Sequence, residues 1–453
     1  MPESPVPWWR LLNRYHWFVL LVASLGWLFD CLDQQLFTLA RVPAMRELLH
    51  NGENVQEYAG YSTSIFLMGW AMGGLTFGVL GDRIGRAKTM MLTILIYSAC
   101  TGLSALSKGF WDFSFYRFIT GVGVGGEFGV GVSLVAEVMP EQARPYALGM
   151  LQALSAVGNV TAAGISMGLG KLEETGVIGR SWRWMFLIGA VPALLVVFIQ
   201  RRLKEPERWQ AAKAAGQIHT NFFGSYAELF RIPRWRRNAI IGLLLACSGI
   251  IGLWGIGFFS PDLIGSVLTK TFQDPERHLT AQQIAGKVTF WKGVNNMCLN
   301  VGAFLGMIAF TRLTSKLGRR RTFAIAFVVA MFSTAAVFLW LHDFTGIFWM
   351  IPIMGFCQLS IFGGYAIYFP ELFPTNLRST GVSFCYNVGR FVAAIGPTAL
   401  GLLTKVVYKD SPEPLRLAGV TMCAIFILGL LVLPFAPETK DQPLPDDERG
   451  FAH

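Results

Sequence analysis

Long apolar runs separated by short charged clusters set the strongest limit on what this chain can fold into. Of its 453 residues, 53% are hydrophobic and only 15% are charged, and the mean hydropathy is +0.47. A soluble chain of this length would carry about a quarter charged residues to cover its surface. We therefore predict an all-α membrane protein, because helices satisfy their own backbone groups within the bilayer.

The apolar runs number twelve when a window of about 19 residues is used. Lys and Arg are most frequent in the loops that face inward if both termini are cytoplasmic. Short loops and tails favour a bacterial inner membrane. Residues 221–231 are either a solvated linker or, as we favour, a short amphipathic helix on the headgroups. The twelve predicted spans lie near 17–40, 60–80, 88–107, 111–136, 145–170, 183–203, 238–260, 288–310, 322–341, 345–369, 378–405 and 415–436.

Several function classes are disfavoured by the sequence. The net charge of +10 comes from clusters between spans and forms no continuous stripe for nucleic acid. All seven cysteines fall inside apolar runs, so neither a disulfide framework nor a metal site is predicted. No catalytic Ser/His/Asp set and no ATP-binding motif is recognisable. We expect a monomer without cofactor or metal that is not an enzyme, and any transport would have to be driven by a gradient.

An internal repeat divides the chain. The segment GVLGDRIGRAK at 78–88 is matched by TRLTSKLGRRR at 311–321, with Gly-Arg recurring 233 residues further on. EVMPEQAR at 137–144 is matched by ELFPTNLR at 371–378, at an offset of 234 residues. We predict two six-helix bundles, 1–203 and 238–453, joined by a basic cytoplasmic linker at 204–237. Parallel repeats of six spans indicate a transporter with its substrate site between the halves.

These motifs resemble the major facilitator superfamily over essentially the whole chain. The loop 78–88 resembles the hallmark loop of that superfamily. The run RFITGVGVGGE at 117–127 and PELFPTNLR at 370–378 resemble proton-linked symporters for metabolites, aromatic acids and sialic acid, and the related sugar porters. The segment 30–33, DCLD, resembles the D-G-x-D of the aromatic-acid branch, with Cys31 in place of the glycine. The resemblance implies alternating access and proton coupling.

Charged residues at the inner ends of the helices are predicted to form a gate. A Glu and an Arg at such an end can pair with neighbouring helices, and the pairs would break when the gate opens. The alternative is that they cap helix ends and fix topology; for Asp82, an acid beside a basic turn, we favour the gate. The predicted gate residues are Asp82, Arg83, Arg86, Glu137, Arg144, Glu371 and Arg378.

The run Gly121 to Gly126 satisfies G-x-G-x-x-G, the pattern of a dinucleotide-binding loop. That function needs a strand before the run and a helix after it. Here the run lies within a predicted span, where small residues four apart let helices approach closely. We interpret it as a packing face.

Four ionisable residues in the first half are candidates for proton coupling. Asp30 and Asp33 share one helix face, and Arg117 on the fourth span is the nearest cation in that half. The resemblance supports an acid of the first span paired with this arginine. Protonation would free Arg117, whereas the alternative is a buried pair that only locks the helices. Glu127 could be a second proton site or could brace another span.

The substrate is predicted to lie against the second half. Tyr386, Asn387 and Arg390 are adjacent on one span, and Arg offers a bidentate fork for a carboxylate; the alternative for Arg390 is a bond to helix-end carbonyls. Lys292 lies near a span end, from which it could reach the surface. The other predicted substrate residues, which could instead be interhelical hydrogen-bond donors, are Gln34, Gln152, Asn159, Asn296, Gln358 and Tyr365.

Together these observations predict a secondary active transporter that couples protons to symport of a small organic anion. An aromatic acid, a monocarboxylate or sialic acid would fit. The alternative is a proton-independent uniporter or exchanger of a neutral polar solute such as a sugar. A transporter-like receptor is a further alternative, which the short tails disfavour.

Overall fold

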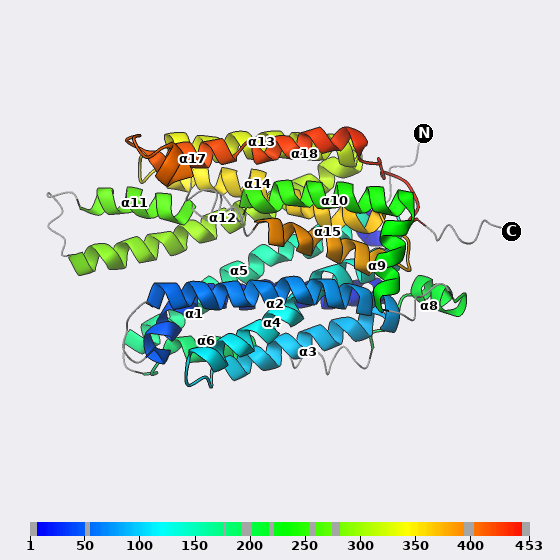
Figure 1. The fold of residues 1–453 in the computed structure, drawn as a ribbon, viewed down its shortest axis with the longest axis horizontal. Helices are drawn as coiled ribbons and strands as arrows, with labels where there is room; N and C mark the ends of the chain where they lie inside the picture. Colours follow the sequence, from blue (N-terminus) through cyan, green and yellow to red (C-terminus); the bar gives the residue numbers. More distant parts are fainter. Residues whose placement is uncertain are drawn as a thin grey trace. The chain divides into compact units, whose positions relative to one another are not determined.

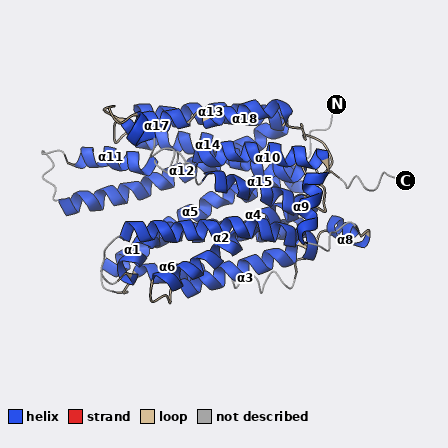
Figure 2. Cartoon of the chain, in the orientation of Figure 1, coloured by secondary structure: helices blue, strands red, loops and turns tan. Residues whose placement is uncertain are grey.

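The computed structural model describes residues 7–49, 55–174, 177–191, 202–216, 222–253, 260–273, 281–393 and 403–445. In these ranges the chain forms helices joined by turns, with no strand (Figures 1 and 2). The predicted all-α fold is confirmed. Eight helices of the described part are long and apolar enough to cross a membrane.

The first half begins with a short 3₁₀ helix and a capped long helix. The side chain of Asn13 accepts a hydrogen bond from the backbone N–H of His16 at 2.8 Å, which satisfies one free donor of the first turn. The helices that follow coincide with the first six predicted spans, except that residues 192–201 of the sixth lie outside the described ranges. The 3₁₀ helix is η1 (Trp8–Leu11), and the six helices that follow are α1 (Arg14–Leu48), α2 (Val55–Ile84), α3 (Arg86–Ser104), α4 (Phe110–Val138), α5 (Arg144–Glu174) and α6 (Ser181–Gly189).

The linker contains two helices, α8 (Glu207–Ala214) and α9 (Phe222–Arg231). Helix α9 confirms the helix predicted over 221–231, except for residue 221, which lies outside the described ranges. Helix α8 was not predicted from the sequence, because its eight residues carry little apolar periodicity.

The second half contains the remaining helices. The predicted spans left residues 261–287 between the seventh and eighth spans without a helix, but α11 occupies the first part of this segment. The twelfth span consists of two helices that meet at Cys423 and Ala424, and residues 254–259 and 394–402 of the seventh and eleventh spans lie outside the described ranges. The elements are α10 (Pro233–Ile251), α11 (Ser260–Phe272), α12 (Ala281–Leu317), α13 (Arg319–Trp340), α14 (Ile347–Glu371), α15 (Arg378–Ala393), the π-helical turn η5 (Leu403–Val407), α17 (Pro414–Met422), α18 (Ile425–Val432) and η6 (Leu433–Phe435).

Two compact units are distinguished by their internal contacts. The first comprises residues 1–239, 366–387 and 441–453, and the second comprises 240–365 and 388–440. Helices α14 and α15 therefore contribute to both units. The predicted bundle limits at 203 and 238 stay a prediction.

The glycine run of α4 packs against α2 in the first unit. A Cβ at Gly125 would lie 1.9 Å from the carbonyl oxygen of Trp70, and one at Gly73 would lie 1.9 Å from that of Val122. The two backbones are therefore too close for any side chain between them. This geometry agrees with the packing interpretation of the run.

The internal repeat is visible as duplicated hydrogen bonds. Arg86 Nη1 donates to the carbonyl of Gly81 at 2.7 Å, and Arg319 Nη1 donates to that of Thr314 at 3.2 Å. The glycine before each arginine has a positive φ, 112° at Gly85 and 89° at Gly318. Only glycine adopts that conformation without strain, which explains why Gly-Arg recurs in both copies.

The second repeated motif behaves in the same way. Arg144 Nε donates to the carbonyl of Ala136 at 3.0 Å, and Arg378 Nε donates to that of Pro370 at 3.1 Å. Each arginine thus closes the turn that its E-x-x-P-x-x-x-R motif builds, by reaching eight residues back. These bonds agree with the alternative interpretation of the two arginines, in which they cap helix ends.

Candidate coupling site and charged cluster

A buried ion pair joins α1 to α4 in the first unit. Arg117 Nη2 lies 3.0 Å from Asp33 Oδ2, and both side chains have 0% exposure. Thr101 of α3 donates its hydroxyl to the other carboxylate oxygen, Oδ1, at 2.7 Å. Three helices thus meet at one carboxylate, with both of its oxygens occupied.

Aromatic rings enclose the arginine of this pair. The Cζ atom of Arg117 lies 4.4 Å from the ring centre of Phe37, 4.9 Å from Phe66 and 5.3 Å from Phe186. Rings at these distances attract a cation and exclude water from it. The charge of Arg117 is therefore balanced by Asp33 in surroundings of low dielectric, where loss of either partner is costly.

The other two coupling candidates are also buried. Asp30 lies one turn before Asp33 on α1 with 2% exposure, and Glu127 has 1% exposure. Glu127 Oε2 accepts a hydrogen bond from Thr93 of α3 at 2.7 Å, and a Cβ at Gly26 of α1 would lie 2.3 Å from Oε1. Glu127 thus lies between α4, α1 and α3, and both of its predicted roles stay predictions.

Four of the predicted gate residues form one buried cluster. Arg86 Nη2 lies 2.9 Å from Asp82 Oδ1 and 3.0 Å from Glu137 Oε1. Arg378 Nη1 lies 2.7 Å from the same Glu137 oxygen. All four side chains are at most 1% exposed, so two positive and two negative charges balance inside the protein.

Asp82 also caps a helix of the second repeat. Its carboxylate accepts hydrogen bonds from the backbone N–H of Ser379 at 3.1 Å and of Thr380 at 2.8 Å, and from the Thr380 hydroxyl at 2.6 Å. These donors lie in the first turn of α15, where a negative charge is stabilised by the helix dipole. The charged cluster therefore fastens the beginning of α15 to the end of α2.

The remaining gate candidates are less involved in this cluster. Arg144 is buried and bonded to its own turn, as described above, and Glu371 is 6% exposed at the end of α14. Arg83 is half-buried. Their predicted gate role stays a prediction.

Several predicted substrate residues bond to the protein itself. In the second unit, the Tyr365 hydroxyl donates to the carbonyl of Leu245 at 2.5 Å and accepts from the N–H of Gly249 at 3.1 Å. Gln358 Nε2 donates to the carbonyl of Gly252 at 2.7 Å. These bonds join α14 to α10 and the residue just beyond it, and they agree with the alternative of interhelical hydrogen bonding.

Two residues of α15 are buried in the first unit. The Tyr386 ring stacks on Phe128 with centroids 4.0 Å apart, and Asn387 donates to the carbonyl of Ser383 at 3.0 Å. A Cβ at Gly74 would lie 2.1 Å from the Asn387 amide, so that side chain is tightly packed against α2. The substrate-binding role predicted for this pair has no support from their burial.

The other substrate candidates are placed as follows. Gln152 is 4% exposed on α5. Asn296 accepts a hydrogen bond from Asn300 at 3.0 Å on α12. The side chain of Lys292 lies outside the description. Gln34, Asn159 and Arg390 are half-buried on α1, α5 and α15.

Sequence reasoning did not select Thr101, Thr93 or the Phe37, Phe66 and Phe186 rings. A threonine in an apolar span usually bonds to its own helix, so no local signal separates the two that face a carboxylate. Phenylalanine is abundant throughout the chain, and only the fold brings these three rings to one arginine.

Comparisons with known proteins give one consistent family. The family model described as Major Facilitator Superfamily matches residues 23–397 and 293–452. The cis,cis-muconate transport protein of Acinetobacter baylyi is 29% identical over 389 residues, 85% of this chain and 86% of that protein. The sialic acid transporter NanX of Escherichia coli is 25% identical over 425 residues, 93% of this chain and 95% of that protein. The solved proton:xylose symporter XylE, with 6-bromo-6-deoxy-D-glucose bound, has a TM-score of 0.75 at 17% identity and covers 95% of this chain and 98% of its own.

Proposed function

Because this chain belongs to the major facilitator superfamily, we propose that it is a secondary active transporter that couples proton movement to symport of a small organic anion. The two relatives named above are transporters and not enzymes, and this chain is a multi-pass membrane protein like them. We place it in a bacterial inner membrane as a monomer with both termini in the cytoplasm. The excess of Lys and Arg in the predicted inner loops supports this orientation.

The ion pair between Asp33 and Arg117 is the observation on which proton coupling depends. A carboxylate that accepts from both Arg117 and Thr101 is stable as an anion while the pair is intact. If the helices shift and the pair opens, an isolated carboxylate in an apolar site takes up a proton. Proton binding to Asp33 and movement of the helices are then thermodynamically coupled. Asp30, one turn away, and Glu127 are the proposed further acids of this half.

An organic acid is the proposed substrate class. Two relatives are named for muconate and for sialic acid, both of which are carboxylates. The second half carries Arg390 on α15, half-buried, and arginine matches the geometry of a carboxylate. Asn296, Gln152, Gln34 and Asn159 are polar residues on long helices that would complete a site for a polar solute.

The charged cluster supports alternating access. Asp82, Arg86, Glu137 and Arg378 join helices of the two repeats through buried ion pairs. Opening the inner side would separate the partners, and their burial makes each pair sensitive to water. We propose that this cluster closes the inner gate, with Arg144, Glu371 and Arg83 as secondary members.

The test measures external pH in a weakly buffered suspension of proteoliposomes as candidate solutes are added one at a time. The panel spans aromatic acids, monocarboxylates, sialic acid and neutral sugars. Alkalinisation with one acid, lost in Asp33→Asn and kept in Asp410→Asn, is the expected result. Asp410 is exposed in a turn and so gives a matched removal of one acid.

Exchange of labelled for unlabelled solute separates coupling from folding. A folded Asp33→Asn protein should still exchange the solute while it fails to accumulate it. Uptake of a solute without any pH change, unaffected by Asp33→Asn, would refute coupling at this site. In that case the alternative of a uniporter or exchanger of a neutral solute would be favoured.

A further inference from the structure

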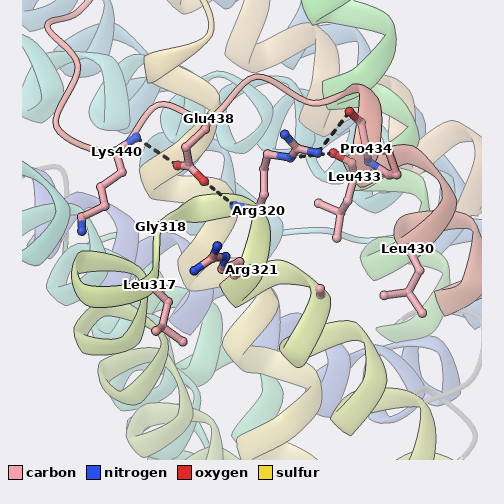
Figure 3. A pocket seen from close by; sticks show the side chains of 10 residues that line it. Leu317, Gly318, Arg320, Arg321, Leu430, Leu433, Pro434, Glu438 and Lys440 are labelled. Carbon is pink, nitrogen blue, oxygen red and sulfur yellow. Dashed lines mark hydrogen bonds between the residues drawn. The ribbon is translucent and has the colours of Figure 1, made fainter.

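A pocket in the second unit lies where three candidate spans reach their ends. Its volume is about 630 Å³, and it is lined by the end of α12, the start of α13, the end of α18 and the segment that follows (Figure 3). The candidate spans 293–317, 319–340 and 414–435 all begin or end at this level. The pocket therefore lies where hydrocarbon gives way to the polar headgroups.

The lining combines an apolar wall with basic side chains. Leu317, Ala324, Leu430 and Leu433 supply apolar surface. Ala324 is five residues into α13, about 7.5 Å along the helix. The apolar wall therefore extends from the span ends into the membrane-spanning part of α13. Leu431 and Phe435, next to the pocket along the chain, are 66% and 63% exposed, as expected of residues that face lipid.

Arg320, Arg321 and Lys440 are the cations of the pocket. Arg320 Nε and Nη2 donate to the carbonyls of Leu433 and Pro434 at 3.1 and 3.2 Å, which holds this guanidinium across the end of α18. Arg321 is exposed, and Lys440 donates to the carbonyl of Lys316 at 3.0 Å. Figure 3 shows these three basic side chains among those that line the pocket.

The one acid of the lining, Glu438, does not cancel these charges in place. Its carboxylate accepts from the backbone N–H groups of Arg319 at 2.8 Å, Arg320 at 3.2 Å and Lys440 at 3.0 Å. Burial raises the pKa of Glu438, but hydrogen bonds from Arg319, Lys440 and Arg320 lower it more, so its pKa is below the usual value. The lining therefore carries three cationic side chains and one carboxylate, a net positive charge that favours an anionic ligand.

The internal repeat shows that one of these cations, Arg320, has no basic counterpart in the first half. At the repeat offset of 233 residues, Arg320 and Arg321 correspond to Ala87 and Lys88. The hydrogen bonds of the turn itself are duplicated in both halves, as described above. Closure of the turn therefore does not explain why the second half carries Arg320.

We propose that this pocket binds the headgroup of an anionic phospholipid, with the phosphate against Arg321, Arg320 and Lys440 and the glycerol and upper acyl chain along Leu317 and Leu430. Basic residues next to a span attract anionic lipids through charge, and the apolar wall suits a molecule that is itself anchored in the bilayer. A free phosphate ion would gain nothing from that wall, which is why lipid is the proposed occupant.

The test uses the full chain purified in neutral detergent. Phosphatidylglycerol and phosphatidylcholine with identical acyl chains are titrated separately, and bound lipid is counted by native mass spectrometry. The expected result is about tenfold tighter retention of phosphatidylglycerol, because each basic side chain favours an anionic headgroup. Arg321→Gln with Lys440→Gln should abolish the preference, whereas Lys88→Gln at the repeat-related position should preserve it.

Three outcomes would overturn the proposal. Equal retention of the two lipids would show that charge does not select the occupant. An unchanged preference in the Arg321→Gln, Lys440→Gln protein would place the selection elsewhere. Competition by inorganic phosphate or glycerol phosphate at concentrations similar to the lipid would indicate a site for a soluble anion. Folding of each variant is checked by its retention of phosphatidylcholine, which should not change.

Discussion

Replacing Glu137 with Gln removes one of the two negative charges of the buried cluster. One oxygen, Glu137 Oε1, accepts from Arg86 Nη2 at 3.0 Å and from Arg378 Nη1 at 2.7 Å. Gln keeps a carbonyl acceptor of nearly the same shape, so packing changes little. What changes is the charge: Asp82 is left as the single acid beside two buried guanidinium groups.

The expected cost follows from these contacts. A hydrogen bond to a charged acceptor is worth about 1 kcal/mol more than one to a neutral acceptor, and Glu137 Oε1 has two arginine partners. The uncompensated positive charge adds to this loss, and removal of one partner of a buried pair costs about 3–5 kcal/mol. Because Gln still accepts hydrogen bonds, we expect Glu137→Gln to lower the free energy of unfolding by about 3 kcal/mol, the low end of this range.

The assay is equilibrium unfolding in mixed micelles, read for Glu137→Gln, Arg378→Gln and the double variant. The double variant restores charge balance, with Arg86 opposite Asp82. Its cost should therefore fall short of the sum of the single costs by about 1–3 kcal/mol. Arg83→Gln, at a half-buried position of the same α2 end, is the control and should change stability by about 0.5 kcal/mol or less.

Additive single costs would refute the reasoning. They would mean that Glu137 and Arg378 do not interact energetically in the folded protein. A Glu137→Gln protein as stable as the parent would show that the second arginine is satisfied in another way.

Other consequences of the geometry can be measured on the same preparation. Thr101→Val removes a hydroxyl from a buried carboxylate and should cost about 1–2 kcal/mol, whereas Thr101→Ser should keep most of the stability. Gly125→Ala should destabilise by about 1–3 kcal/mol through backbone overlap with α2, while Gly131→Ala, whose new Cβ would meet no atom of another helix within 4 Å, should not. Since the folded-state pKa of Glu438 is lowered, its contribution is present at neutral pH and lost as pH falls through that pKa. Unfolding of Glu438→Gln should accordingly depend less on acid pH than unfolding of the parent.

Sequence alone predicted the fold class and singled out charged residues that form buried ion pairs in the structure. Hydropathy located the helices because a lipid-facing helix must be apolar along its length, and the repeat offsets aligned the Gly-Arg and E-x-x-P-x-x-x-R turns correctly. Arg117 with Asp33 was anticipated as one of two pairings, since few cations in that half are available to a buried acid. Charge in an apolar run is a strong signal because it is expensive there.

The contacts of uncharged polar side chains could not be predicted from the sequence in the same way. The sequence predicts that Tyr386 and Asn387 bind substrate; in the fold their side chains pack against Phe128 and Gly74, and the substrate-binding role stays a prediction. Tyr365 likewise bonds to backbone carbonyl and N–H groups of the neighbouring helix segment. A single hydroxyl or amide can be satisfied either by a solute or by a neighbouring helix, and only the three-dimensional arrangement decides between these.

The duplicated turns have a mechanical consequence. At each turn an arginine bonds to the carbonyl five residues back, and a threonine hydroxyl bonds to the glycine carbonyl, Thr89 to Gly85 and Thr322 to Gly318, both at 2.7 Å. The joints between α2 and α3 and between α12 and α13 are thus closed by the same two bonds, and we expect each pair of helices to move as one body. On that expectation, bending during transport would occur within the helices or at other connections, and not at these two turns.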